Sequence, residues 1–296
     1  MLEVLVLIIS ITALVFPSTA KPMDISVESS IFILTGEIRK GDFLALKRAI
    51  LKKGAIPSSV WVGHSPGGDV EEAISIGRFF RKAMVEVTAI EMCNSACFLL
   101  WAGGATRAQS NATFGLHRPR YDAAYYSKLS PAEADSKYRR LSENVRSYLL
   151  EVDVPTTIID QMMSKKSTEA LFIHGNELVI DVIPDNKGQI GNSPAHEEWI
   201  IAKCGGLSPD EEVDYYLIDQ SDFLKKNVHQ LAEVLTEEQA TFYSERMEAF
   251  EFLMKDLSAG YIEYLRKKGS EIEKCERSVK REVRATLFSE LKKNSP

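Results

Sequence analysis

The chain lacks a concentrated basic face. It carries 36 lysine and arginine residues against 42 aspartate and glutamate residues, which gives a formal net charge of -6 at pH 7. Nucleic acids and anionic lipid surfaces are bound by clusters of positive charge. We therefore expect neither of them as a partner.

Histidine and cysteine are scarce, with five and four residues among 296. Near the cysteines the sequence has no further His or Cys pair at the spacing of metal ligands. We therefore expect no metal site and no cofactor. The sequence also has no internal repeat and no low-complexity tract.

The apolar run at the N-terminus is too short to favour a membrane span. Residues 4–16 are almost wholly apolar, whereas a transmembrane helix needs about 20 such residues. Ser18 and Ala20 match the small residues of a secretory cleavage site, although Glu3 stands where a positive charge is usual. We interpret residues 1–20 as a signal peptide, with a retained N-terminal membrane anchor as the alternative. The protein would then be exported, to a periplasmic or extracellular compartment.

The four cysteines fit an oxidising compartment. Cys93 and Cys97 bracket Ser95, and Cys204 and Cys275 lie at opposite ends of the C-terminal region. Four cysteines allow three pairings. The economical prediction is one disulfide between Cys93 and Cys97 and another between Cys204 and Cys275.

Short apolar runs alternate with helical patterns in the first part of the chain. Strands are predicted at residues 30–35, 59–63, 85–90 and 112–116, and helices at 41–53, 70–83 and 96–102. Alternation of this kind implies crossover connections and a largely parallel sheet. The fold class is therefore predicted as α/β.

After His117 the pattern becomes mostly helical. Helices are predicted at 130–150, 156–163 and from 167 to about 175, and a last strand at 178–183. Residues 184–194 are rich in glycine, asparagine and proline, so we place a linker at 185–199, between a domain at 21–184 and a helical region at 200–296. We interpret this C-terminal region as a solvated all-α extension, with a partner-binding module as the alternative.

Three short motifs follow successive strands. Residues 65–68 read Ser-Pro-Gly-Gly, Ser95 precedes the helix at 96–102, and His117 follows the strand at 112–116. Taken singly, a Gly-Gly turn is more often a tight connection, a serine before a helix is more often an N-cap, and a lone histidine is more often structural. Together they fall at the ends of parallel strands, which converge on one crevice. A hydroxyl, a base and backbone donors are what acyl transfer requires.

This order of motifs resembles the Clp protease proteolytic subunit (ClpP) and its relatives of the ClpP/crotonase fold. The similarity covers about residues 31–178. It implies repeated β-α crossover units, a peptide or protein substrate, and a homo-oligomer in which subunits stack through the helix at 130–150.

The resemblance also implies a serine peptidase with Ser95 as nucleophile and His117 as general base. The oxyanion hole would come from the backbone N–H groups of Gly67 or Gly68 and of Ala96. Cys93 and Cys97 stand outside the position of the nucleophile, and an exported chain would oxidise them.

The third catalytic residue has no acid at the position that the resemblance implies, which falls near Met162. Asp160 is the nearest substitute, and Asp122 and Asp181 are poorer candidates. A Ser-His dyad without an acid is also open. His64, beside the Gly-Gly turn, is predicted to be a packing residue.

Two other functions stay open. A crotonase-type enzyme would use the two backbone donors to stabilise a thioester enolate, but export disfavours it because coenzyme A thioesters are cytoplasmic. A catalytically silent binding or scaffold protein of the cell envelope would keep the fold and use its C-terminal helices for a partner. The missing acid supports this last alternative.

Overall fold

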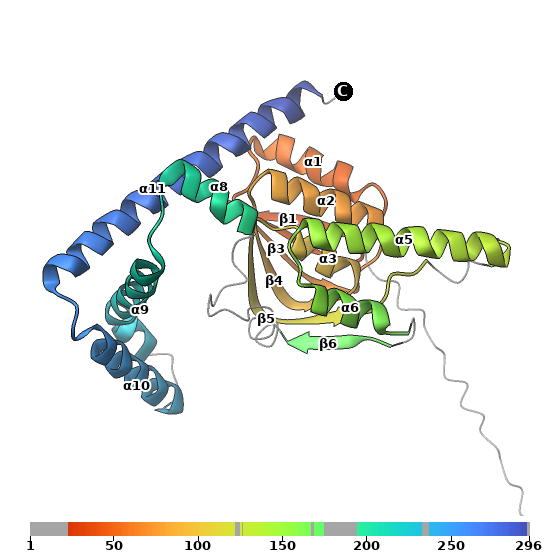
Figure 1. Cartoon of the computed structure of the whole chain (residues 1–296). Coiled ribbons are helices and arrows are strands. Elements are labelled where there is room, and N and C mark those ends of the chain that lie inside the picture. The colour runs from red at the N-terminus through yellow and green to blue at the C-terminus, as the bar shows by residue number, and fades with distance from the viewer. Residues whose placement is uncertain are drawn as a thin grey trace, which may run out of the picture.

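A six-stranded sheet forms the centre of the described part of the chain (Figure 1). The computed structural model describes residues 23–121, 125, 127–166, 169–174, 194–232 and 237–294. The strands follow one another across the sheet in chain order: β1 (Asp24–Glu28), β2 (Ile31–Thr35), β3 (Ser59–Ser65), β4 (Glu86–Cys93), β5 (Thr106–Leu116) and β6 (Leu171–His174). Strands β2 to β5 are parallel, and β1 and β6 are antiparallel edge strands. The predicted mixed α/β fold with a mostly parallel sheet is confirmed, although the sequence pattern does not predict β1.

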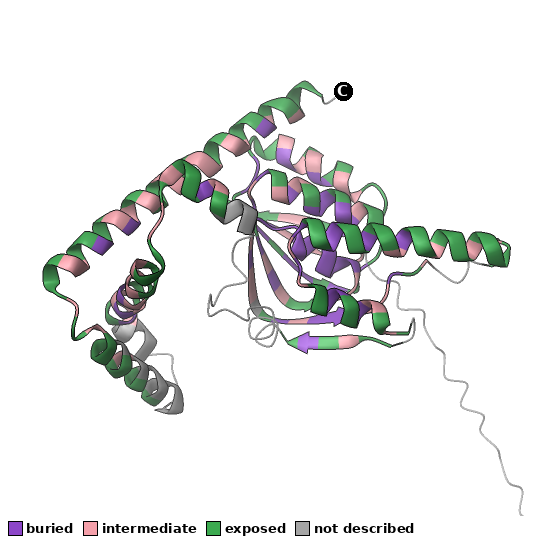
Figure 2. Cartoon of the chain, in the orientation of Figure 1, coloured by how far each residue is buried: buried purple, intermediate pink, exposed green. Residues whose placement is uncertain are grey.

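Three helices make the crossovers between the parallel strands. They are α1 (Asp42–Lys53), α2 (Val70–Lys82) and α3 (Ala96–Ala102). Helix α3 packs on β3, β4 and β5, and α2 packs on α3. Figure 2 shows the buried positions concentrated in the strands and the helices that adjoin them. Every residue of α3 is buried, so this helix forms the middle of the core.

One acidic side chain ties α1 to α2. Asp69 caps α2 by accepting a hydrogen bond from the backbone N–H of Glu72 at 2.8 Å, as its spacing predicts. The carboxylate of Glu72 accepts instead from the backbone N–H groups of Gly41 and Phe43, at 3.0 and 2.6 Å. Glu72 therefore satisfies free donors at the start of α1, where a negative charge is also favoured by the helix dipole.

Helix α5 (Pro131–Glu151) is fixed to the core through Tyr148. The Tyr148 hydroxyl donates to the backbone carbonyl of Leu99 in α3 at 2.9 Å, and the side chain is fully buried. Burial raises the pKa of this phenol. A Cβ atom on Gly77 or on Gly103 would overlap the Tyr148 hydroxyl, so glycine at both positions is what allows α5 to approach.

The capping signal at Ser130 and Glu133 is confirmed, because the two residues form a reciprocal capping box at the start of α5. Helix α6 (Thr156–Ser164) follows at its predicted place. The short helix predicted from residue 167 to about 175 is wrong, because residues 171–174 form β6. At these residues, antiparallel pairing with β5 stabilises a strand more than the local sequence signal stabilises a helix.

The C-terminal region consists of helices in its described part. They are α8 (Pro194–Cys204), α9 (Pro209–Ala232), α10 (Glu237–Met254) and α11 (Ala259–Lys293). Residues 194–199 of the predicted linker at 185–199 form the start of α8. The remainder of this linker, the strand predicted at 178–183 and the segment at 1–20 lie outside the described residues. No helix among the described residues has the length and apolar character to cross a bilayer.

Helix α11 joins the sheet domain to the other C-terminal helices (Figure 1). Leu287, near its C-terminal end, belongs to the central core, and Arg284 donates to the backbone carbonyl of Met84 at 3.1 Å. In the middle of α11, a disulfide joins Cys275 to Cys204 of α8, as predicted. The C-terminal region is therefore an extension that the last part of α11 anchors to the sheet domain.

The first stability prediction concerns the close approach at Gly77. We expect Gly77→Ala to lower the free energy of unfolding by about 3 kcal/mol, because overpacking forces Tyr148 away from Leu99. Gly260→Ala in α11 is the matched control, since a Cβ atom there would meet no atom within 4 Å. This control is expected to raise stability by about 0.5–1 kcal/mol. Urea unfolding measures both, and equal effects of the two substitutions would contradict the packing argument.

The second prediction concerns Glu211, which joins α9 to α11. Its carboxylate accepts from Lys268 at 2.8 Å, from the Ser208 backbone N–H at 2.7 Å and from Tyr264 at 2.9 Å. These bonds, above all the one from Lys268, lower the pKa of Glu211 from 4.5 to about 2. A lowered carboxyl pKa gives stability that is present above the usual pKa and is lost as the pH falls toward the folded value.

We therefore expect Glu211→Gln to lose less stability than the wild type between pH 6 and pH 3, as measured by urea unfolding. Glu245→Gln, at an exposed position of α10, is the control and should keep the pH dependence of the wild type. Identical pH dependence in wild type and Glu211→Gln would refute this assignment.

Candidate active site

Ser95 sits in a backbone conformation that a side-chain-bearing residue rarely adopts. Its φ is 54° and its ψ is -119°, at the point where β4 turns into α3. Such a residue costs about 1–3 kcal/mol and persists only where neighbouring structure holds it. The holding bonds are from Ser95 N–H to the Gly115 carbonyl, at 2.7 Å, and from Phe98 N–H to the Ser95 carbonyl, at 3.0 Å.

The Ser95 hydroxyl does not cap the helix. Ser95 occupies the N-cap position of α3, yet its side chain makes no capping hydrogen bond. The ordinary structural role of a serine before a helix is therefore not the role of Ser95. Its half-buried side chain is left for other chemistry.

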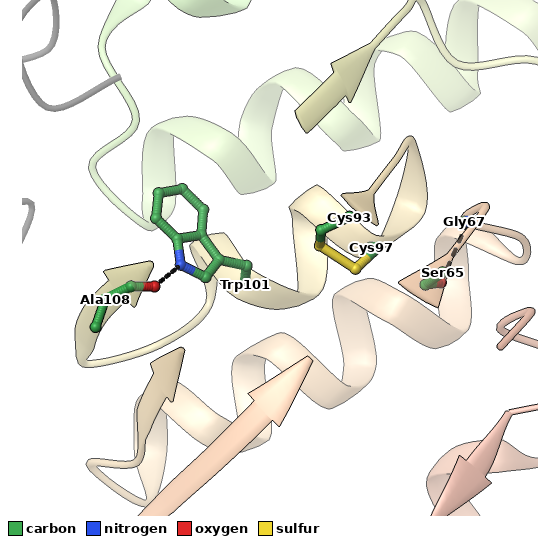
Figure 3. The surroundings of a disulfide bond; sticks show 6 residues. All are labelled: Ser65, Gly67, Cys93, Cys97, Trp101 and Ala108. Carbon is green, nitrogen blue, oxygen red and sulfur yellow. Dashed lines mark hydrogen bonds between the residues drawn. A yellow bond between two sulfur atoms is a disulfide. The ribbon is translucent and has the colours of Figure 1, made fainter. Parts of the chain in front are cut away.

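A disulfide brackets Ser95 in the sequence, and Figure 3 shows the bond between its two cysteines. It joins Cys93, the last residue of β4, to Cys97 in the first turn of α3, and both residues are buried. Further along α3, Trp101 Nε1 donates to the Ala108 carbonyl of β5 at 2.7 Å. Both ends of the helix that follows Ser95 are thus fixed to the sheet. The disulfide also leaves neither sulfur as a thiolate nucleophile.

The Gly-Gly turn after β3 is pressed against Ser95. A Cβ atom on Gly67 would lie 2.6 Å from Ser95 Cβ and 2.9 Å from Ala96 N. Gly67 has a φ of 98° and Gly68 a φ of 138°, values that favour glycine. Any larger residue at position 67 would push the turn off the start of α3.

The other side of this turn contacts Ile38. Ile38 N–H donates to the Gly67 carbonyl and Asp69 N–H to the Ile38 carbonyl, each at 2.8 Å. A side chain on Gly68 would overlap that Ile38 carbonyl. The turn is therefore held between the segment after β2 and the start of α3.

Two backbone donors at this junction are unused within the described residues. Gly67 N–H donates to Ser65 Oγ at 3.3 Å. Gly68 N–H and Ala96 N–H donate to no acceptor in the part of the chain that the structure describes. Of the two glycines that the sequence leaves open as oxyanion donors, this pattern favours Gly68.

His117 follows β5, two residues beyond the Gly115 that binds Ser95. Its Nδ1 lies 2.8 Å from the Arg118 carbonyl oxygen. A carbonyl can only accept, so this contact assigns the proton to Nδ1 and leaves Nε2 with a lone pair. The half-buried ring is therefore held in the tautomer of a general base.

Asp160 does not lie in the position of an orienting acid. Its carboxylate accepts from Arg146 at 2.7 Å, and its side chain is 62% exposed, on α6 facing α5. Asp122 and Asp181 lie outside the described residues. Within the described part of the chain, the hydrogen-bond partner of His117 is the Arg118 carbonyl and no carboxylate.

His64 is not the packing residue that its position predicts. Its side chain is 56% exposed, and its Nε2 lies 2.9 Å from a carboxylate oxygen of Glu91. His64, Glu91 and Asn111 have φ values of 45°, 51° and 49°, and the strand register shifts beside them. These bulges turn His64 outward, an effect of strand pairing that a single strand does not reveal.

Two further side chains lie beside the site, and the sequence pattern does not single them out. A Cβ atom on Gly115 would lie 2.8 Å from Asn94 Cγ and 3.1 Å from Phe172 Cε1. Asn94 Oδ1 is buried without a hydrogen-bond partner among the described residues. Phe172 belongs to β6, which the helical interpretation of residues 167–175 conceals.

Comparison with known proteins yields structural similarity only. No family model matches the chain, and no curated protein matches it. A mutant of ClpP1 from Listeria monocytogenes has a TM-score of 0.41 and 16% identity, covering 54% of this chain and 94% of its own. The ClpP protease catalytic domain from Plasmodium falciparum has a TM-score of 0.39 and 18% identity, covering 53% of this chain and 86% of its own. At these low TM-scores neither likeness establishes an activity.

The third prediction concerns the disulfide beside Ser95. We expect the double substitution Cys93→Ala with Cys97→Ala to speed hydrogen exchange at the hydrogen-bonded Ser95 and Phe98 amides about tenfold or more, because the strained turn loses one restraint. The matched control removes the distant disulfide by Cys204→Ala with Cys275→Ala and should leave these amides unchanged. Unaltered exchange in the first variant would mean that hydrogen bonds alone hold the turn.

Proposed function

We propose that the protein is an exported serine hydrolase of the ClpP-like peptidase type, with Ser95 as nucleophile and His117 as general base. The observation that carries the proposal is the strained, uncapped Ser95 pressed against the Gly67 turn, where two backbone N–H groups have no acceptor among the described residues. The backbone bond between Ser95 and Gly115 sets Ser95 near the end of β5, from which His117 follows.

The proposed chemistry runs through an acyl-enzyme. His117 Nε2 takes the proton from Ser95 Oγ as this oxygen attacks the substrate carbonyl carbon. The negative charge that develops on the carbonyl oxygen is stabilised by the N–H groups of Gly68 and Ala96. His117 then gives its proton to the leaving amine as the C–N bond breaks. A water molecule, deprotonated by the same ring, hydrolyses the ester to release the acid and Ser95.

The Arg118 carbonyl replaces the usual carboxylate in orienting the base. It accepts from His117 Nδ1 and so fixes the ring and its tautomer. The proposed catalytic unit is therefore a Ser-His dyad with a backbone orienter, and Asp160 has no part in it.

The proposed compartment, substrate class and oligomeric state rest on the disulfides and on the resemblance to ClpP. Two disulfides within one chain are typical of an oxidising compartment, which supports export. A peptide or protein substrate and a homo-oligomer, with α5 as the stacking helix, are carried over from the ClpP resemblance of the sequence motifs.

A catalytically silent envelope protein is the second candidate. The observation that favours it is the partner of His117, since a carbonyl dipole stabilises an imidazolium less than a full negative charge does. In that case the same turn would serve as a binding surface.

The fourth prediction separates the two candidates. A fluorophosphonate probe should attach covalently to the folded wild type at one site, because an activated serine oxygen attacks its phosphorus and displaces fluoride, and Ser95→Ala should abolish the adduct. Mass spectrometry of the intact protein measures the labelling. Ser75→Ala, which removes a hydroxyl from the outer face of α2, is the control and should be labelled like the wild type.

Equal labelling of wild type and Ser95→Ala would exclude Ser95 as the nucleophile. A folded wild type that stays unlabelled would favour the silent protein.

A further inference from the structure

Arg118 makes two contacts beside the candidate base, one through its backbone and one through its side chain. Its carbonyl accepts from His117 Nδ1 at 2.8 Å. Its guanidinium lies over the ring of Tyr138 in α5, with Arg118 Cζ 5.5 Å from the ring centroid. This distance is within the range of a cation–π contact. Arg118 therefore connects the His117 ring to an aromatic ring of α5.

The backbone of Arg118 is restricted because Pro119 follows it. A residue before proline is biased toward extended conformations, and Pro119 is itself buried. Adjacent residues of an extended segment direct their side chains to opposite sides. The Arg118 side chain therefore leaves the chain on the side away from the His117 ring. A contact on that far side can fix the rotation of the segment, and with it the direction of the Arg118 carbonyl.

Tyr138 offers this contact from a rigid support. It comes three residues before Leu141 and seven before Val145, and both of these are buried. The three side chains share one face of the helix, so Tyr138 extends the face by which α5 packs on the core. The capping box of Ser130 and Glu133 holds the start of the same helix.

The Arg118 side chain is withdrawn from water on one edge. Its Nε is buried and has no hydrogen-bond partner among the described residues. A buried N–H without an acceptor is unfavourable, so this group would gain hydration if the side chain turned outward. The Tyr138 ring opposes that turn, because the cation–π contact is lost when the guanidinium leaves. Removing the ring would release the side chain and loosen the carbonyl that it fixes.

We propose that Tyr138 is a positioning residue for the general base. Its ring holds Arg118 so that the Arg118 carbonyl keeps the proton of His117 on Nδ1 and leaves the lone pair on Nε2. The part that a carboxylate plays in a Ser-His-Asp triad is thus divided between a carbonyl and the aromatic ring that fixes it. The inference rests on the proposed hydrolase function, but the tautomer of His117 can be measured without any reaction.

The tautomer is measured by ¹⁵N NMR of the His117 ring at about pH 8.5, where histidine is ordinarily neutral, and His117→Gln assigns its signals. We expect the Nδ1–H tautomer in the wild type and in Tyr138→Phe, which keeps the ring. In Tyr138→Leu about half or more of the rings should carry the proton on Nε2, because the hydrogen bond that selects Nδ1–H is weakened. Arg118→Ala keeps the carbonyl and removes the guanidinium, so it should behave in the same way and serves if the leucine variant fails to fold.

The rate of labelling by a fluorophosphonate is the second measurement. Tyr138→Leu and Arg118→Ala should react about threefold or more slowly than the wild type, which is within the contribution of a cation–π contact. Tyr138→Phe should keep the wild-type rate. Tyr264→Leu in α11 is the matched control, because Lys268 lies over the Tyr264 ring at 5.6 Å in the C-terminal extension. It should change neither the tautomer nor the rate.

The outcomes separate the inference from the function on which it rests. An unchanged His117 tautomer in both Tyr138→Leu and Arg118→Ala would overturn the inference. A shifted tautomer with an unchanged labelling rate would also overturn it, because the tautomer would then have no effect on the reaction. A tautomer that shifts as expected in a folded protein that no fluorophosphonate labels would overturn the hydrolase function alone.

Discussion

The hydrogen bond from Ser95 N–H to the Gly115 carbonyl is the contact on which the candidate site depends. It fixes a serine whose φ of 54° is unfavourable for any residue with a Cβ atom. Without it the chain between β4 and α3 would relax, and Ala96 N–H would move away from the Gly67 turn. The disulfide between Cys93 and Cys97 links the residues on either side of the same turn. Strain at Ser95 is therefore maintained by the sheet, by α3 and by a covalent bond together.

The second constraint is the close approach of neighbouring backbone segments and side chains, which glycine permits both at the candidate site and in the core behind it. Gly67 lets the turn after β3 contact Ser95, and Gly115 leaves room for Asn94 and Phe172. Behind the site, Gly77 and Gly103 admit the Tyr148 hydroxyl to the middle of the core. The buried α3 is thus held from the sheet side and from the α5 side, so the orientation of its first residue follows from the packing of the whole domain.

Much of this fold can be predicted from the sequence because its signals are local. Strands β2 to β5 are apolar runs, and Asp69 and Ser130 begin helices with the side-chain bonds that their spacing predicts. The order of the three motifs also leads to Ser95 and His117. What the sequence conceals depends on pairing between distant segments. Strand β6 exists through its ladder with β5, and the outward turn of His64 comes from bulges shared with neighbouring strands. Phe172 could not be placed beside Ser95 without that ladder.

The partner of His117 decides how strong a base this site can have. A carbonyl oxygen and a carboxylate both accept from Nδ1, and both therefore select the tautomer with a free Nε2. They differ once the ring has taken a proton, because the carboxylate brings a full negative charge and the Arg118 carbonyl only a dipole. In a Ser-His-Asp triad, replacing the acid by its amide lowers kcat about 10⁴-fold, an effect that includes the wrong tautomer. The Arg118 carbonyl keeps the productive tautomer, so the loss that comes from a wrong tautomer does not arise. The loss that comes from the missing negative charge remains. On the proposed mechanism, the hydrolysis would therefore be slow, and the backbone donors and the position of Ser95 would contribute more to its rate than His117 would.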